Sequence, residues 1–176
     1  MSPSHFPSYP PDPRGRHSRE DSIEICKQIR KERPDATFGA DIIAGFPTET
    51  DTDFLTTYNF INSLDISYLH VFTYSERANT DAINYEQIVP KPTRAKRSKM
   101  FQILSSKKNR YFNDQFINQI RPVLYESIKN GQLIGHTDNY IEVRSDIKPQ
   151  LINLSLIHIS EPTRRTPISY AVFCLK

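Results

Sequence analysis

The stretch Gly39-Ala-Asp-Ile-Ile-Ala-Gly-Phe-Pro-Thr-Glu-Thr50 has the pattern of an apolar strand that ends in a polar turn. Tyr68-Leu-His-Val-Phe-Thr-Tyr-Ser-Glu-Arg77 repeats this pattern, and the residues between the two stretches have helical spacing. A strand, a helix and a second strand form a βα unit that leads into a parallel neighbour, with polar side chains at the carboxyl ends of the strands. The sequence therefore predicts an α/β fold with its chemistry at that edge.

Further elements are predicted on both sides of this unit. Helical periodicity and caps at Ser18 and Thr50 predict helices over 18–32, 51–64 and 93–118. Strands are expected at 36–44, 68–74, 123–127 and 139–144, with turns at 129–131 and 135–138 joining the last two. Cys26 reads as a small core residue of the first helix. The predicted core positions of the second helix are Phe54, Leu55, Tyr58 and Ile61.

Composition limits the classes of function. The chain has 176 residues, 37% hydrophobic content and a mean hydropathy of −0.57, which is low for a self-sufficient α/β core. Cys26 and Cys174 have no metal-ligand spacing, so we expect no metal ligands and a reducing, cytoplasmic location. No apolar run approaches the roughly 20 residues of a membrane span. The net charge of +3 is too small to imply a nucleic-acid partner by itself, and we expect a monomer.

Both ends differ from the middle of the chain. Five prolines within residues 1–17 predict a disordered or non-native leader, with a polyproline ligand as the weaker alternative. At the other end, Leu154-Ser-Leu-Ile-His-Ile-Ser-Glu-Pro-Thr-Arg164 resembles a translated sequencing adapter. We expect residues 154–176 to be an artefact of this kind; an alternating strand is the alternative.

Strand alternation places the candidate site. Asp41, Ile43 and Gly45 share one face of the first strand, and His70 and Phe72 share one face of the second. A carboxylate in an apolar strand is costly unless it has a partner, which a polar barrel lumen or a cofactor pocket would supply. An ion pair with a neighbouring lysine or arginine is the alternative. Gly45 would allow a ligand to approach the backbone closely.

These residues resemble a known family. Asp41-Ile-Ile-Ala-Gly-Phe-Pro-Thr-Glu-Thr50 and His70-Val-Phe-Thr-Tyr-Ser-Glu-Arg77 are similar to strands of the radical-SAM methylthiotransferases, and the similarity runs over about residues 18–153. The resemblance implies that S-adenosylmethionine binds at this end of the sheet. The cofactor-binding candidates are Asp41, Gly45, Glu49, His70, Ser75 and Arg77.

The resemblance also divides the chain. Residues 18–120 would be the C-terminal part of a (β/α) barrel with a linking helix, and residues 121–153 part of a small RNA-binding β barrel of the TRAM type. Gly135-His-Thr-Asp-Asn-Tyr140 resembles the branch that methylthiolates C2 of N6-threonylcarbamoyladenosine beside the tRNA anticodon. Fragments of sister enzymes acting on isopentenyladenosine or a ribosomal protein are alternatives, as is a non-catalytic RNA-binding remnant.

This sequence departs from the family in two ways. Thr48 and Asn79 stand where members usually carry Gly, and Glu76 where they carry Pro. The family also needs two [4Fe–4S] clusters, which require thiolate ligands. Their cysteine motifs would lie upstream of Ser18, so this chain would ligate neither cluster. The resemblance therefore implies a piece that is inactive alone, and the catalytic residues stay unassigned.

RNA contacts are expected in two places. Lysines and arginines of the helix at 93–118 could follow the backbone of the tRNA anticodon stem-loop, and the turn at 135–140 could contact loop bases. The predicted RNA-binding residues are Arg94, Arg97, Lys107, Lys108, His136, Asn139 and Tyr140. An ordinary solvated helix face is the alternative.

Overall fold

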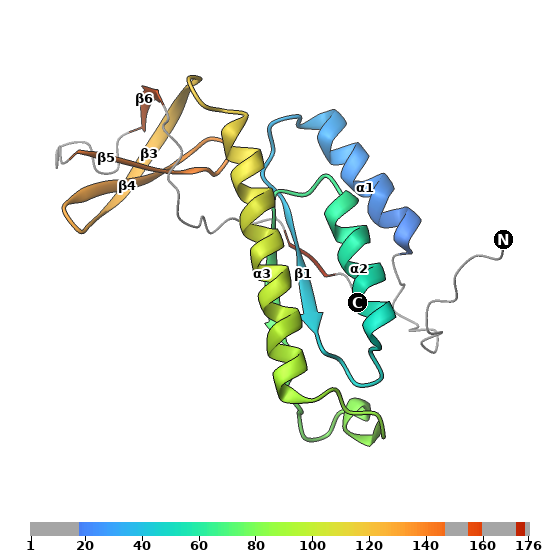
Figure 1. The fold of residues 1–176 in the computed structure, drawn as a ribbon. Coiled ribbons are helices and arrows are strands. Elements are labelled where there is room, and N and C mark those ends of the chain that lie inside the picture. Colours follow the sequence, from blue (N-terminus) through green and yellow to red (C-terminus); the bar gives the residue numbers. More distant parts are fainter. Residues whose placement is uncertain (1–17, 147–154, 160–171, 175–176) are drawn as a thin grey trace.

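A computed structural model describes residues 18–146, 155–159 and 172–174. Its first part alternates helices and strands (Figure 1): α1 (Arg19–Glu32), β1 (Gly39–Ala44), α2 (Asp51–Ser63), β2 (Tyr68–Thr73), the short 3-10 helix η1 (Asp81–Asn84) and α3 (Lys91–Asp114). The strands β3 (Ile120–Lys129), β4 (Gln132–Thr137), β5 (Glu142–Asp146), β6 (Ser155–Ile159) and β7 (Val172–Cys174) follow. The leader at 1–17 and most of 147–176 lie outside the described residues, so the predictions for both ends stay predictions.

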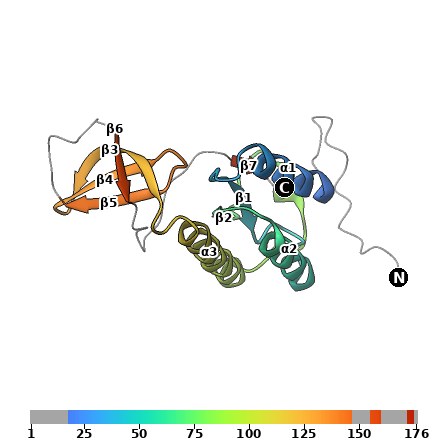
Figure 2. The same ribbon diagram turned by 90° about the horizontal axis from the view of Figure 1, so that it is seen from above.

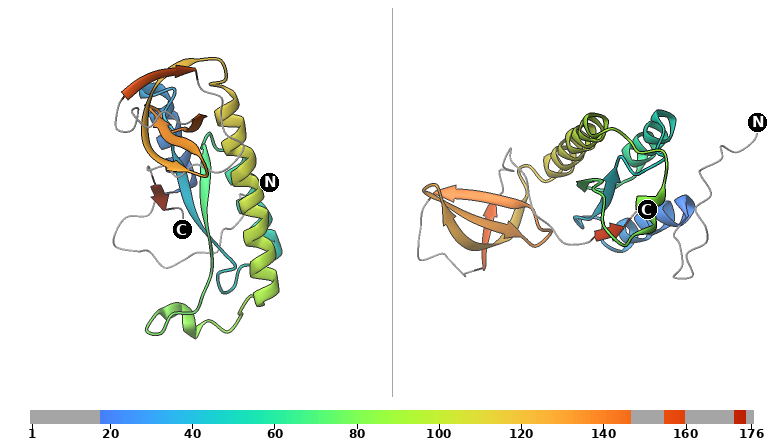
Figure 3. Two further views of the ribbon diagram at one scale, coloured as in Figure 1. Left: turned by 90° about the vertical axis from the view of Figure 1, so that its left-hand side faces the viewer. Right: turned by 90° about the horizontal axis from the view of Figure 1, so that it is seen from below.

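The strands form two sheets. β1 and β2 pair in parallel, with Asp41 opposite His70 and Ile43 opposite Phe72, and β7 pairs with the other edge of β1. The second sheet is antiparallel, in the order β5-β4-β3-β6. The predicted α/β class is therefore confirmed, while closure into a barrel stays a prediction. Figure 2 shows α1, α2 and α3 around one side of β1 and β2, and Figure 3 shows the antiparallel sheet beside the C-terminal end of α3.

Both predicted helix caps are present. The Ser18 hydroxyl accepts the Asp21 N–H (3.0 Å) while the Asp21 carboxylate accepts the Ser18 N–H (2.7 Å). Thr50 and Asp53 form the same reciprocal pair at the start of α2. Each capping box satisfies two backbone donors that a helix start leaves unpaired. The sequence therefore determines where α1 and α2 begin.

The main core lies between the parallel sheet and the three helices. Ala40, Ile42 and Ala44 of β1 are buried against side chains from all three helices. Cys26 is a core residue of α1, as predicted. Leu55 is 50% exposed, so its predicted place in the core of α2 is wrong. Its position follows the helical period, but it faces away from the sheet.

The β element has its own small core, and its sheet has four strands where two were predicted. Val123, Tyr125, Leu133 and Val143 form its buried cluster. The predicted turn at 129–131 is present, with Asn130 and Gly131 at positive φ. The turn predicted at 135–138 is wrong in part, because Gly135 lies inside β4 and pairs with Tyr125. α3 also ends at Asp114, four residues earlier than predicted.

Candidate functional site

One face of the β1–β2 pair is open. Ile43 (48% exposed) and Phe72 (52% exposed) lie on it, because the helices cover only the opposite face. Tyr68 lies on the same side against Gly39, where a β-carbon would come within 2.6 Å of its ring. The ring of His70 meets that of Tyr68 edge-on at 5.1 Å. The sheet thus presents an apolar face with a histidine and a carboxylate beside each other.

That carboxylate, Asp41, has a buried oxygen without a partner. Its Oδ1 atom is shielded from solvent and makes no hydrogen bond. Among the described residues, no lysine or arginine lies within ion-pair distance of it, so the alternative of a simple structural ion pair has no support here. A buried polar atom of this kind is costly to leave unsatisfied. Asp41 therefore has unused hydrogen-bonding capacity at the open face.

The turn after β1 is fastened to α3. Gly45 adopts φ +80°, and a β-carbon there would lie 2.5 Å from Cγ of Arg94. The Glu49 carboxylate accepts the Gly45 N–H (2.9 Å) and the Arg97 guanidinium (2.6 Å). Burial raises the pKa of Glu49, and the hydrogen bond from Arg97 opposes that rise. Gly45 and Glu49 therefore have structural roles that the sequence did not predict, and cofactor contact stays a prediction for both.

Arg94 and Arg97 are internal anchors. Arg94 is 3% exposed and donates to the carbonyl oxygens of Val89 (2.6 Å) and Tyr74 (3.2 Å) and to the Glu76 carboxylate (2.6 Å). The last bond is the main cause that lowers the pKa of Glu76 to about 2. Arg97 is 5% exposed and bonds to Glu49 and Asp51. This burial contradicts the prediction that the two guanidinium groups contact RNA phosphates.

Ser75 and Arg77 lie in the segment after β2, and both are exposed. Neither side chain makes a hydrogen bond to another residue in the part of the chain that the structure describes. Thr48 and Asn79, which stand where the family usually carries Gly, adopt φ +72° and +66°. Both positions thus have the left-handed backbone that glycine accepts at least cost.

The basic residues of α3 divide between the interior and the surface. Lys108 donates from Nζ to the carbonyl oxygens of Asn62 (3.0 Å) and Leu64 (2.7 Å) at the end of α2, and burial lowers its pKa. Lys107 is exposed, as an RNA contact requires. A row of exposed basic side chains at helical spacing accompanies it: Lys96, Lys99, Lys107 and Arg110, called here the α3 basic stripe. Of these four, only Lys107 is among the predicted RNA-binding residues.

The three predicted RNA-binding residues of the β element differ in their exposure and contacts. His136 stacks on Tyr140, with ring centroids 4.8 Å apart and an interplanar angle of 26°, and its Nδ1 lies 3.3 Å from the Glu126 carboxylate. Tyr140 is 39% exposed, so its ring is accessible to a base. Asn139 is 6% exposed, and its Oδ1 accepts the Thr137 hydroxyl (2.6 Å). Asn139 is therefore largely buried, and its contact with RNA stays a prediction.

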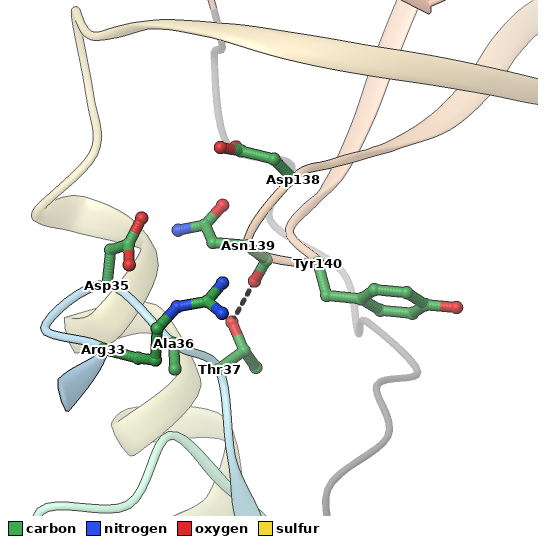
Figure 4. Close-up of a pocket in the computed structure, with 7 residues that line it drawn as sticks. All are labelled: Arg33, Asp35, Ala36, Thr37, Asp138, Asn139 and Tyr140. Carbon is green, nitrogen blue, oxygen red and sulfur yellow. Dashed lines mark hydrogen bonds between the residues drawn. The ribbon is translucent and has the colours of Figure 1, made fainter. Parts of the chain in front are cut away.

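A small cavity lies where the loop before β1 meets the turn between β4 and β5. Its lining residues are Arg33, Asp35, Ala36, Thr37, Asp138, Asn139 and Tyr140 (Figure 4). Arg121 bridges the two sides through Asp35 (2.5 Å) and Asp138 (2.7 Å), and the Thr37 hydroxyl donates to the Asn139 carbonyl oxygen. No local signal could have placed Arg33, Asp35 and Thr37 at this site, since Thr37 and Asn139 are 102 positions apart in the chain.

The described residues do not fit an iron–sulfur cluster. Cys26 is buried in the core, and burial raises the pKa of its thiol, whereas clusters need thiolates. Within residues 18–146 and the two short strands beyond, no group of three or more His, Cys, Asp or Glu side chains could hold a metal ion. No helix in the same part of the chain has the length and apolar character to cross a membrane.

No family model matches the chain, but individual relatives do. It is 43% identical over 131 residues to a threonylcarbamoyladenosine tRNA methylthiotransferase of Rickettsia prowazekii, covering 74% of this chain and 30% of the relative. The corresponding enzyme of Aquifex aeolicus is 32% identical over 130 residues (74% and 31%). A tRNA-2-methylthio-N(6)-dimethylallyladenosine synthase of Ehrlichia chaffeensis is 33% identical over 126 residues (70% and 28%).

The chain thus spans about 30% of the length of the curated relatives it matches. The matches cover about 70% of the chain and carry two related enzyme names, both of tRNA methylthiolation. Together with the paired strands at Asp41 and His70, this similarity shows that the chain belongs to the tRNA methylthiotransferase family, as a portion of such a protein.

Proposed function

We propose that this chain is part of a tRNA-modifying radical-SAM enzyme that methylthiolates C2 of N6-threonylcarbamoyladenosine beside the anticodon. One observation carries the proposal: the open face of β1 and β2 holds an unpartnered Asp41 oxygen beside His70, on the strands that resemble the family. The substrate branch is supported by one relative, the threonylcarbamoyladenosine enzyme at 43% identity; other enzymes of that name are 30–32% identical, and dimethylallyladenosine enzymes are 32–36% identical. We expect the full-length parent to be a cytoplasmic monomer.

The open face fits part of an S-adenosylmethionine site. Asp41 has a free acceptor, Ile43 and Phe72 offer apolar contact, and Ser75 and Arg77 lie free beyond β2. Arg77 suits a carboxylate, because its planar fork can donate to both oxygens. When bound, S-adenosylmethionine would supply the radical chemistry of the family. Since the described residues do not fit a cluster, we expect the clusters to be held elsewhere in the parent and this portion to be inactive alone.

The α3 basic stripe supports contact with the RNA backbone. Lys96, Lys99, Lys107 and Arg110 are exposed along one helix, and the stripe runs from the turns after β1 and β2 toward the β element. An RNA stem that lies along α3 would meet these charges. At the far end, the stack of Tyr140 on His136 presents an aromatic surface to a loop base.

Binding of a tRNA anticodon stem-loop hairpin tests the RNA part of this proposal. We expect the double variant Lys99→Gln/Lys107→Gln to weaken binding, measured by fluorescence anisotropy over a range of salt concentrations. The slope of log affinity against log salt should fall by about one for each phosphate interaction that the variant removes. The control is Lys27→Gln/Lys31→Gln, which removes two exposed charges from α1. Equal effects of the two double variants would exclude the stripe as the RNA-binding surface.

Equilibrium dialysis with S-adenosylmethionine tests the enzymatic part. We expect Asp41→Leu to reduce binding of the cofactor, while Glu24→Gln, at an exposed position of α1, shows the effect of removing an unrelated carboxylate. If the chain binds the hairpin but retains no cofactor, a non-catalytic RNA-binding protein becomes the better account. The cofactor result therefore separates the two classes of function.

A further inference from the structure

The cavity between the two parts of the chain has features of a ligand site. Its volume is about 170 Å³, and it opens where the loop at 33–37 faces the turn at 138–140. A single water takes roughly 30 Å³ in the liquid, so the cavity has room for a group of several atoms. Figure 4 shows side chains from both sides of the interface around this space.

Asn139 brings an unsatisfied donor to the cavity. The residue is 6% exposed; its Oδ1 accepts the Thr137 hydroxyl, and its backbone oxygen accepts the Thr37 hydroxyl. Its Nδ2 is shielded from solvent and has no hydrogen-bond partner. In Figure 4 this nitrogen is turned toward Asp35 and Arg33, which line the same space. A fully buried donor without an acceptor is costly, so an acceptor brought by a ligand would relieve it.

The charges around the cavity favour a neutral ligand with hydrogen-bond acceptors. Arg121 lies between the carboxylates of Asp35 and Asp138 and bonds to both. Arg33 lines the cavity and forms no ion pair with any residue of the described part of the chain. Its guanidinium adds donors beside Asn139 and a flat surface on which a ring can stack. The two nearby carboxylates disfavour a free phosphate at the same place.

We propose that this cavity binds one unpaired nucleobase of the tRNA, through Arg33 and the Nδ2 of Asn139. The inference rests on the proposed function and assigns a base pocket to the junction between the barrel part and the β element. RNA-binding proteins read unpaired bases by stacking and by hydrogen bonds to base edges, and paired bases have those edges occupied. The Tyr140–His136 stack beside the cavity would receive a neighbouring base.

A comparison of two RNAs tests this inference with the full 176-residue chain. One is the anticodon stem-loop hairpin, and the other is a fully paired duplex with the same stem sequence. We expect the chain to bind the hairpin at least about fivefold more tightly, since a bidentate base contact contributes on that scale. Arg33→Ala should abolish most of this preference. Lys31→Ala is the matched control, because it removes an exposed charge two residues earlier in the same chain segment.

A second variant addresses the buried donor. Asn139→Asp keeps the oxygen that accepts from Thr137 but replaces the Nδ2 donor by an acceptor, so hairpin binding should fall while duplex binding is retained. Circular-dichroism melts would confirm that each variant folds. A hairpin preference that survives Arg33→Ala would overturn the inference and leave the proposed function standing. Failure of the unaltered chain to bind either RNA would instead refute both the RNA contact of the proposed function and the base pocket.

Discussion

Glu49 and Arg97 form a buried ion pair that ties the turn after β1 to α3. Their N–O distance is 2.6 Å, and the two side chains are 15% and 6% exposed. Glu49 also accepts the Gly45 N–H, and Arg97 also bonds to Asp51 at the start of α2 (2.7 Å). One guanidinium therefore positions the turn at the carboxyl end of β1 and the first residue of the next helix. The geometry of the proposed cofactor end of the sheet therefore depends on Arg97.

Removal of the Arg97 guanidinium should destabilise the folded protein. Arg97→Ala leaves the buried Glu49 carboxylate unpaired, and we expect it to lower the free energy of unfolding by about 3 to 5 kcal/mol. Urea denaturation measures the change. Lys96→Ala is the control, since Lys96 is the preceding residue of α3 and is exposed; its effect should stay within about 0.5 kcal/mol. Similar values for the two variants would show that the pair contributes no more than a surface charge.

Thr48→Gly should stabilise the protein. Thr48 adopts φ +72°, a conformation that strains a β-branched residue by about 1 to 3 kcal/mol, and glycine would relieve this strain. Part of the relief is offset because glycine has more conformational freedom to lose on folding. A net gain of about 1 kcal/mol is expected, because the backbone bond from Thr48 N–H to the Gln87 carbonyl oxygen (2.7 Å) is kept. The measurement is again urea denaturation. Thr52→Gly within α2 should instead destabilise slightly, and a loss of stability at both positions would contradict the strain argument.

The elements of the α/β part were predictable because local chemistry determines them. Capping boxes at Ser18 and Thr50 mark the helix starts, and two apolar stretches mark β1 and β2. The β element was predicted less well. Gly135 suggests a turn by its residue type, but its missing side chain instead allows the Leu124 carbonyl oxygen to approach. That requirement arises from strand pairing, which composition alone does not reveal.

The site was predictable where it depends on strand alternation, as for Asp41 and His70. For Arg94 and Arg97 a usable signal was present: both share the three-to-four-residue spacing of Phe101 and Leu104 and so belong to the buried side of α3. Their charge suggested exposure, but internal carboxylates and carbonyl oxygens satisfy it. The cavity at Asn139 required contacts between distant parts of the chain, which periodicity does not contain.

Acid should loosen the junction between the two parts of the protein. The hydrogen bond from Arg121 holds the pKa of Asp35 below its ordinary value of 3.8. Because the pKa is lower in the folded state, the stabilisation is complete above pH 3.8 and is lost as the pH falls through the folded-state pKa. The unfolding free energy of the unaltered protein should therefore approach that of Asp35→Asn on acidification. A difference between the two proteins that is independent of pH would exclude this carboxylate as the titrating group.

Gly135→Ala should disrupt the β element. A β-carbon at this position would lie 2.8 Å from the Tyr125 α-carbon and closer still to the Leu124 carbonyl oxygen, and backbone atoms inside a paired sheet cannot move aside cheaply. We expect a loss of about 3 kcal/mol, measured by urea denaturation and by amide exchange of β3 and β4. Gly131→Ala is the matched comparison: no atom lies within 4 Å of its β-carbon, so only its positive φ opposes the change, at about 1 kcal/mol. A larger loss at Gly131 than at Gly135 would mean that β3 and β4 do not pair in this register.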